Sequence, residues 1–270
     1  MIGLLCATPM ELAIIPPLLS AAADAASPAG TRLVTGKAGG LDVLALSAGV
    51  GKVPAAAAAR FLLDRYPLEA LVIYGIAGAL SPHAKLGDLI IASELLPGDV
   101  GIAHSGGFST TGPGLCEDKR LVFCPSFSAS EDLLESARRA AEGAHLAYRL
   151  GRVLTCDQVV VEPELRAHLG EVFDAVAVEM EGAAAAQVAA GEGLPFAAVR
   201  AISDESSHDF VGLEDLLEYR GHPRRNIWQR RFRLAVSDAG TIARVRELAR
   251  GRDLALASLE AFMRSFLAQR

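Results

Sequence analysis

Two acidic residues follow two predicted buried strands in the second half of the chain. The apolar run 175–178 leads towards Glu181, and the apolar run 196–202 leads into Asp204. A helix of small residues is predicted between the strands, over residues 182–190. Open α/β sheets bind ligands beyond the carboxyl ends of their strands. The two carboxylates are therefore candidates for one site, with general acid or hydrogen-bonding chemistry.

Each acid taken alone also has a structural explanation. Glu181 falls near a helix N-terminus, where negative charge is favourable, and Asp204 could cap the segment that follows it. Arg200 weakens this explanation, because it interrupts an otherwise apolar strand four residues before Asp204. An arginine buried in a sheet needs acidic or ligand partners. The three side chains together therefore indicate a polar site.

A further acid follows the first predicted strand. The strand covers residues 2–7, and Pro9 suits the first turn of a helix after it. Glu11 lies in that first turn, where a carboxylate also interacts favourably with the helix dipole. Glu11 is thus either a helix-stabilising charge or a third acid at the same edge of the sheet.

The surrounding elements read as an α/β pattern with one irregular region. In the first part of the chain we expect a hairpin over residues 32–47, a helix over 53–63 and a buried strand over 68–75. Further elements are expected after residue 84. These are a strand entry at 85–92, helices at 131–143 and 163–169, a strand at 152–156 and a C-terminal helix at 254–267. Residues 95–130 are rich in glycine and proline, and we expect a long functional or mobile loop there, with a short strand at 120–123.

Composition favours one domain and excludes several classes of protein. With 270 residues and 51% hydrophobic content, the chain can bury one substantial core. A net charge of −6 argues against a nucleic-acid binder. The sequence shows no zinc-ligand spacing, and residues 48–52 do not match a phosphate-binding loop. We expect no metal, no cofactor and no nucleic-acid partner.

Targeting signals and cysteine usage point to the cytoplasm. The apolar start has Glu11 within it and no basic region before it, which argues against a signal peptide. We find no apolar run long enough for a membrane span. The four cysteines lack CxxC spacing, which favours reduced thiols. Cys116 and Cys124 lie in the irregular region, and whether they pair stays open.

Two groups of motifs carry a family resemblance. The segments VEMEGAAAAQVA and PFAAVRAISD, together with GIAGAL and KLGDLIIAS, resemble the methylthioadenosine/S-adenosylhomocysteine nucleosidases and their relatives in the nucleoside phosphorylase superfamily. The resemblance implies an α/β single domain over residues 1–270, with a central mixed, partly barrel-like twisted sheet flanked by helices. Relative to the family, we expect a loop insertion near 95–130 and a basic helical C-terminal insertion near 206–250.

The resemblance also implies a role for each candidate residue. Glu11 would be the base that activates water, Arg200 would help to orient that water, and Asp204 with Ser203 would protonate the purine. Met180 and Glu181 would hold the ribose. The remaining substrate contacts would be Ile76, Gly78 and Val159, and Val159 stands where the family places an aromatic side chain against the base.

The reaction class follows from what the resembling phosphorylases have and this chain lacks. Those enzymes bind phosphate with arginines and a hydroxyl, whereas the matching positions here hold Glu11, Ile73 and Ile76. A carboxylate repels a dianion, so we expect hydrolysis of a purine nucleoside with a modified 5′ position, of the methylthioadenosine/S-adenosylhomocysteine or futalosine type. The alternatives are a phosphorylase using arginines of residues 220–233, or a nucleoside-binding relative without turnover. We expect a homo-oligomer, with a dimer favoured.

Overall fold

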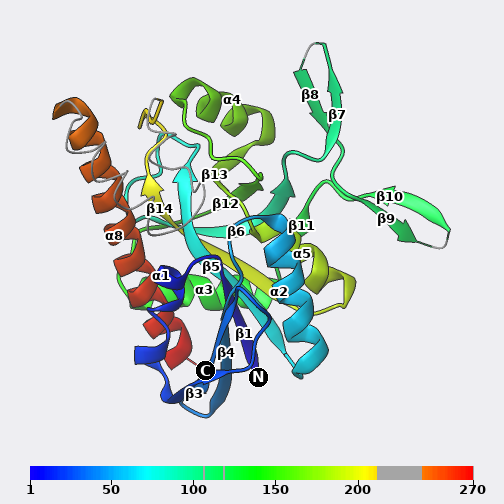
Figure 1. The fold of residues 1–270 in the computed structure, drawn as a ribbon, viewed down its shortest axis with the longest axis vertical. Helices are drawn as coiled ribbons and strands as arrows, with labels where there is room; N and C mark the ends of the chain where they lie inside the picture. The colour runs from blue at the N-terminus through cyan, green and yellow to red at the C-terminus, as the bar shows by residue number, and fades with distance from the viewer. Residues whose placement is uncertain (106, 118, 212–238, 270) are drawn as a thin grey trace.

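A closed ring of five strands forms the centre of the computed structural model, which describes residues 1–105, 107–117, 119–211 and 239–269 (Figure 1). The ring consists of β5 (Ala70–Ala79), β14 (Phe196–Asp204), β6 (Leu89–Pro97), β12 (Tyr148–Thr155) and β13 (Ala175–Glu179). β5 pairs with β14 in parallel and with β13 in antiparallel orientation, which closes the ring. The expected mixed, barrel-like sheet is confirmed.

The sheet continues beyond β5 as an open extension. β1 (Ile2–Cys6) pairs in parallel with both β5 and β4 (Leu41–Ser47), and β3 (Arg32–Ala38) and β2 (Ser20–Ala25) follow in antiparallel orientation. The hairpin predicted over residues 32–47 is confirmed. β1 is buried along its whole length, as expected for a strand covered on both faces.

Helices cover the two faces of this sheet. α2 (Lys52–Arg65) and α5 (Gly182–Gly191) pack together on one face, while α3 (Glu131–Gly143) and α8 (Ala239–Ala268) pack together on the other. The small residues of α5 allow close approach, because Ala183, Ala185, Ala186 and Ala189 are fully buried. The other helices of the described residues are α1 (Pro9–Leu12), a 3₁₀ turn at Pro16–Leu18 and α4 (Pro163–Phe173).

The segment that carries Glu181 and Asp204 is arranged differently from a simple strand-helix-strand unit. β13 and β14 are not neighbours; β5 lies between them and pairs with each. The pairing with β13 is antiparallel, and it places Ala177 and Val178 beside the last two residues of β5, Ala79 and Gly78. Closure of the ring, and not adjacency in a parallel sheet, brings the two acids together.

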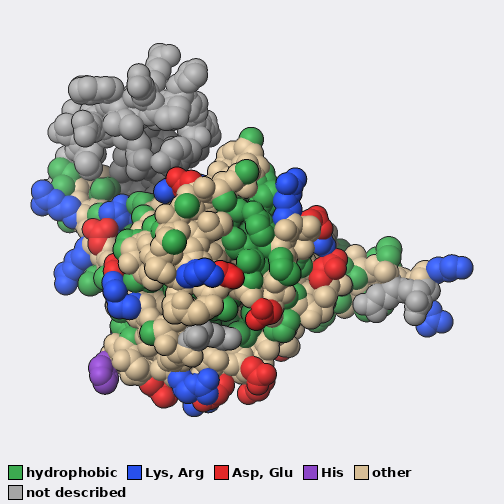
Figure 2. Space-filling view, turned by 90° about the horizontal axis from the view of Figure 1, so that it is seen from below, with side chains coloured by type: hydrophobic (Ala, Val, Ile, Leu, Met, Phe, Trp, Pro, Cys, Tyr) green, Lys and Arg blue, Asp and Glu red, His purple; other side chains and the backbone are tan. Residues whose placement is uncertain are grey.

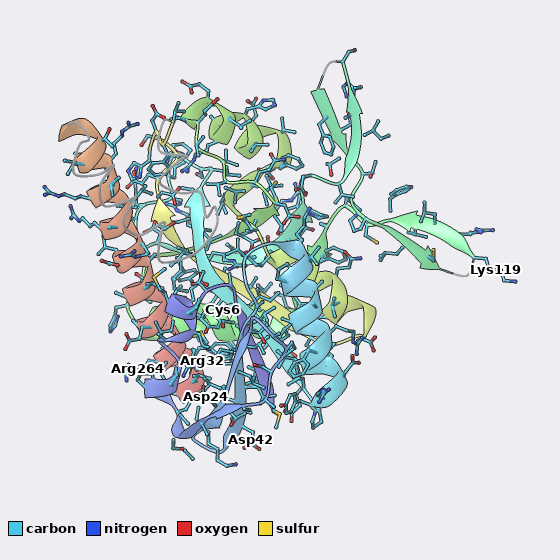
Figure 3. The ribbon with its side chains drawn as sticks, in the orientation of Figure 1. Cys6, Asp24, Arg32, Asp42, Lys119 and Arg264 are labelled. Atoms are coloured by element: carbon cyan, nitrogen blue, oxygen red, sulfur yellow. The ribbon has the colours of Figure 1, made fainter. Side chains whose placement is uncertain are left out.

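The irregular region forms two projecting hairpins (Figure 1), and the space-filling view shows an arm that extends from the body (Figure 2). One pairs β7 (Gly101–His104) with β8 (Gly107–Thr110), the other pairs β9 (Gly114–Glu117) with β10 (Arg120–Phe123), and β11 (Phe127–Ser128) then returns to β6. The short strand expected at 120–123 is confirmed, but the rest is more regular than the expected loop. Figure 3 places Lys119 at the tip of the second hairpin.

Three further expectations concern the cysteines, a membrane span and the basic stretch near the C-terminus. Cys6, Cys116, Cys124 and Cys156 are all free thiols. Within the described residues, no helix is long and apolar enough to cross a membrane. Much of the basic helical insertion expected near 206–250, including the arginines of 220–233, lies outside the described residues.

A glycine fixes how closely α8 approaches the strand that carries Asp204. A Cβ at Gly251 would lie 2.0 Å from the carbonyl oxygen of Ser203, which is backbone and cannot turn away. We predict that Gly251→Ala lowers the free energy of unfolding by about 1–3 kcal/mol, because α8 must shift. The matched control is Gly191→Ala in α5, where a Cβ meets nothing within 4 Å and alanine is the better helix former. Chemical denaturation of both variants measures this difference, and equal stabilities would contradict it.

Candidate functional site

One cavity of about 250 Å³ is lined by all three predicted acids, Glu11, Glu181 and Asp204. They come from the start of α1, the start of α5 and the end of β14. The predicted contacts Ile76, Gly78, Val159, Met180 and Ser203 line the same cavity. Of the predicted site residues, only Arg200 does not line it.

Glu11 is buried and held by four hydrogen-bond donors. Its Oε2 accepts from the backbone N–H groups of Ala7 (3.1 Å) and Thr8 (2.8 Å) and from the Thr8 hydroxyl (2.9 Å). Its Oε1 accepts from the backbone N–H of Ile76 on β5 at 2.9 Å. Thr8 also caps α1, so Thr8 and Glu11 form a capping box. The carboxylate is thereby fixed in direction, and Oε1 is the oxygen with room for a further donor.

Glu181 sits at the first position of α5 but does not cap it with its side chain. Its Oε1 accepts from the backbone N–H of Gly51 at 2.8 Å, which draws the turn before α2 into the site. Burial, followed by repulsion from Glu179, raises the pKa of Glu181 to about 7, while Arg200 and the Gly51 N–H act in the opposite direction. The side chain therefore exchanges its proton near neutral pH.

Arg200 lies behind the cavity and balances its charge. It is fully buried, with Nη2 donating to Glu179 and lying 3.9 Å from Glu181. Glu179 in turn accepts from Thr155 and from the backbone N–H groups of Glu181 and Gly182. Glu179 is therefore the side chain that caps α5, a role that the sequence had suggested for Glu181.

Asp204 is held between a hydroxyl and a guanidinium. Oδ1 accepts from the Ser203 hydroxyl at 2.6 Å, and Oδ2 lies 2.6 Å from Nη1 of Arg166. A Cβ at Gly78 would come within 2.8 Å of Oδ2, so glycine there leaves room for the carboxylate. Asp204 does not cap a following helix in the described part of the chain, and its contacts are those of a cavity-wall acid.

Apolar residues make the opposite side of the opening. Val159 is 60% exposed and Val50 is 55% exposed, although both line the cavity. Side chains of this kind expose apolar surface at the cavity mouth, where a ligand would cover it. Val159 occupies the position expected for an aromatic side chain, and no aromatic residue lines the cavity within the described residues.

Sequence reasoning missed two residues that hold the acids. Thr8 had a readable signal, because Thr8-Pro9-Met10-Glu11 matches the capping-box pattern. Arg166 had none, because one arginine on an amphipathic helix is more often solvated than buried. Its burial depends on α4 lying against the end of β14, which only the folded chain reveals.

The carboxylates that line the cavity suit acid and base chemistry. No group of three or more His, Cys, Asp and Glu residues that could hold a metal ion occurs in the described ranges. Carboxylates in a shared, largely buried cavity can donate a proton to a leaving group, accept one from water and stabilise positive charge that develops between them.

Sequence comparison finds relatives among known nucleosidases. The 5′-methylthioadenosine/S-adenosylhomocysteine nucleosidase of Geobacillus thermodenitrificans is 34% identical over 195 residues, covering 70% of this chain and 78% of that protein. The nucleosidase of the same name from Tolumonas auensis is 31% identical over 204 residues, covering 75% and 85%. A sequence profile of the phosphorylase superfamily matches residues 1–218.

Solved structures show the same fold. The 5′-methylthioadenosine/S-adenosylhomocysteine nucleosidase from Neisseria meningitidis, in complex with methylthio-immucillin-A, has a TM-score of 0.75 at 21% identity and covers 100% of this chain and 99% of its own. The futalosine hydrolase of Helicobacter pylori has a TM-score of 0.74 at 21% identity, covering 100% and 97%. From its matching profile, its curated relatives and this shared architecture, the chain belongs to the phosphorylase superfamily.

Proposed function

We propose that the protein hydrolyses the N-glycosidic bond of a purine nucleoside with a modified 5′ position. The observation that carries this proposal is the convergence of Glu11, Glu181 and Asp204 on one cavity from distant parts of the chain. The curated relatives are nucleosidases that cleave such nucleosides by name. Membership of the superfamily supports the reaction class, and the three acids supply its chemistry.

Asp204 is the acid that assists departure of the base. A purine leaves more readily when its N7 takes up a proton as the bond from C1′ to N9 breaks. Ser203 orients the carboxyl by its hydrogen bond to Oδ1. The side chain lies at the very end of β14, next to Gly78, where a planar base can approach it closely.

Glu11 is the base that activates water. Its four donors fix the carboxylate, and Oε1 has capacity to accept a proton from a water molecule attacking C1′. Arg200 is a positioning residue in this scheme, not a direct water ligand, because it lies behind Glu179 and Glu181. As C1′ gains positive charge, the neighbouring carboxylates stabilise it.

Glu181 and Met180 hold the sugar. The carboxyl of Glu181 can accept from ribose hydroxyls, while Met180 packs its thioether chain against the ring. A carboxyl with a pKa of about 7 changes charge with pH, which affects both ribose binding and the total charge around the reacting carbon.

The charge of the cavity favours water over phosphate. Among the described lining residues, the acids are Glu11, Glu179, Glu181 and Asp204, and the one cation is Arg166, already paired with Asp204. Desolvating a phosphate dianion beside several carboxylates is unfavourable. Arginines of the 220–233 stretch, which an alternative phosphorolysis would require, lie outside the described residues.

The identity of the 5′ group distinguishes two subclasses. A methylthio or homocysteinyl group and a futalosine-type group both extend the nucleoside at the same carbon, and the apolar side chains at the opening suit either. The structural neighbours include a nucleosidase and a futalosine hydrolase. The four free thiols suit a reducing compartment, so we assign the reaction to the cytoplasm.

We also propose a homodimer formed through the projecting hairpins. Their exposed apolar side chains include Ile102 (62% exposed), Leu121 (59%) and Phe123 (53%). Such surface on an arm that extends from the body is typical of an interaction site. The hairpins leave the body after β6, on the side of the cavity mouth near residues 97–99.

The first test is base release from a panel of 5′-modified purine nucleosides, with and without inorganic phosphate. We expect equal release in both conditions, and Asp204→Asn to lower turnover by about 10²- to 10⁴-fold. The melting temperature of this variant should change little, because Arg166 keeps the backbone oxygens of Val160 and Glu205 as partners. Base release that requires phosphate, or a loss of stability as large as the loss of turnover, would contradict the proposal.

A second prediction concerns the pH dependence of stability. The pKa of Glu181 is raised from 4.5 to about 7 by folding, so between these values the folded protein holds a proton that the unfolded chain has lost. This group therefore makes the free energy of unfolding fall as pH rises through that range. The melting temperature of Glu181→Gln minus that of wild type should therefore rise between pH 5 and pH 8, by on the order of 5 °C.

The control for this measurement is Glu192→Gln, which changes a 53% exposed side chain at the other end of α5. Its melting temperature relative to wild type should vary much less over the same range. If the Glu181→Gln difference is also independent of pH, Glu181 does not titrate as described.

A third prediction concerns the assembly. Light scattering after size-exclusion chromatography should give twice the chain mass of 28.3 kDa. The double substitution Leu121→Ser and Phe123→Ser should shift the mass towards the monomer, because it removes apolar surface from the second hairpin. Val172→Ser, which removes a side chain that is 61% exposed on α4, is the control and should leave the mass unchanged. An unaltered dimer in the hairpin variant would exclude this interface.

A further inference from the structure

The cation that meets the general acid is a fixed part of the cavity wall. Arg166 is 2% exposed and lines the cavity, and its Nη1 lies 2.6 Å from Oδ2 of Asp204. Its Nε donates to the carbonyl oxygen of Val160 at 3.0 Å and Nη1 donates to that of Glu205 at 3.0 Å. The guanidinium also lies 5.2 Å from the centre of the Phe210 ring. These contacts hold it in one orientation.

One donor group of this guanidinium remains available. Within the described residues, Nη2 of Arg166 has no hydrogen-bond partner, and it is not among the polar atoms sealed from solvent. A buried guanidinium with an unpaired donor at a ligand cavity is a recognition element for an acceptor. In a bound ligand, the acceptor for Nη2 must lie beside the ligand atom that Asp204 contacts.

We propose that Arg166 makes the site select a 6-oxopurine base over a 6-aminopurine base. This inference rests on the proposed function, in which Asp204 meets N7. The 6-substituent of a purine lies on the same edge as N7, next to it. A 6-oxopurine presents two acceptors there, N7 and O6, whereas adenine presents the N7 acceptor and the N6 amino donor. The proton that Asp204 gives to N7 and the Nη2 donor of Arg166 together match the first pattern.

The contacts of Asp204 make the second pattern unfavourable. An adenine amino group would have to share a carboxylate oxygen that already has a donor, because Oδ1 accepts from Ser203 and Oδ2 is paired with Arg166. The amino group would also lie against Nη2, which places two donors together without an acceptor between them. Unpaired polar groups of this kind discriminate strongly when they are buried.

The same contact assists the reaction with an oxopurine. When the C1′–N9 bond breaks, its electron pair passes into the base while Asp204 gives its proton to N7 and Glu11 takes one from water. Electron density also moves onto O6, where Arg166 donates. A donor aimed at developing negative charge stabilises the transition state more than the ground state. Arg166 is therefore a specificity-determining residue, distinct from the acid that transfers the proton.

The test compares nucleosides that differ only at position 6, namely 5′-methylthioinosine and 5′-methylthioadenosine. For wild type we expect kcat/KM to be at least about 10-fold higher for the 6-oxo compound. In Arg166→Gln the ratio should fall by about 10-fold or more, because a glutamine amide pairs with the amino edge of adenine. Arg166→Lys, which keeps a donor and the charge, should retain the direction of the preference. Arg264→Gln, on the outer side of α8 (Figure 3), is the matched control and should keep the wild-type ratio.

Binding of the free bases gives a readout that does not need turnover. By calorimetry, wild type should bind hypoxanthine more tightly than adenine, and Arg166→Gln should remove that difference. A wild-type preference for the 6-amino compounds, or a ratio unchanged by Arg166→Gln, overturns the inference even if hydrolysis is observed. Failure to cleave either nucleoside overturns the proposed hydrolysis, while the base-binding preference still decides the role of Arg166. If Arg166→Gln does not fold, the wild-type preference and Arg166→Lys carry the test.

Discussion

The buried charge balance around Arg200 is the interaction on which the site depends. A lone guanidinium in the middle of a sheet would be expensive to bury, and so would a cluster of carboxylates. Arg200 donates to Glu179 and lies close to Glu181, and a Cβ at Gly75 would come within 2.4 Å of its Nη1 and 2.6 Å of Oε1 of Glu11. One cation therefore lies beneath three acids, and it allows acids to face the cavity without a metal ion between them.

The closed ring of strands supplies the geometry that this balance needs. β5 contributes Ile76 and Gly78 to the cavity and pairs with β13, which leads into Glu181, and with β14, which ends at Asp204. β5 also pairs with β1, after which Glu11 follows. A single strand thus fixes the relative positions of all three acids. Helices on both faces bury eight of the ten residues of this strand, so its register cannot slip without exposing core residues.

Much of this arrangement could be predicted from the sequence, for identifiable reasons. Strand positions were readable because β1 and β5 are continuous apolar runs and β14 is apolar up to Arg200. Glu11 and Asp204 were readable as acids that follow or end β1 and β14. Family motifs then connected Glu11, Glu181 and Asp204, although they are far apart along the chain. These predictions rely on local pattern, which a single sequence carries well.

What the sequence did not reveal depends on long-range packing. Nothing in the letters around Arg166 shows that α4 turns it towards Asp204, and nothing near Glu179 shows that this side chain, rather than Glu181, satisfies the start of α5. The hairpins of residues 101–123 were expected as loop because their glycines and prolines hide the strand pairing. In each case the deciding contact joins residues that local periodicity cannot relate.

The capping box at α1 has a consequence for how this protein can change. Thr8 and Glu11 begin a helix of four residues, and the same carboxylate is the proposed base. Building the first turn and aiming the base are one structural event, so folding and chemistry share their determinants at this point in the chain. Loss of the Thr8 hydroxyl would remove one of the four donors that fix the carboxylate, and stability gained elsewhere in the fold would not replace it. The direction of one carboxylate therefore constrains this turn in addition to the stability of a short helix.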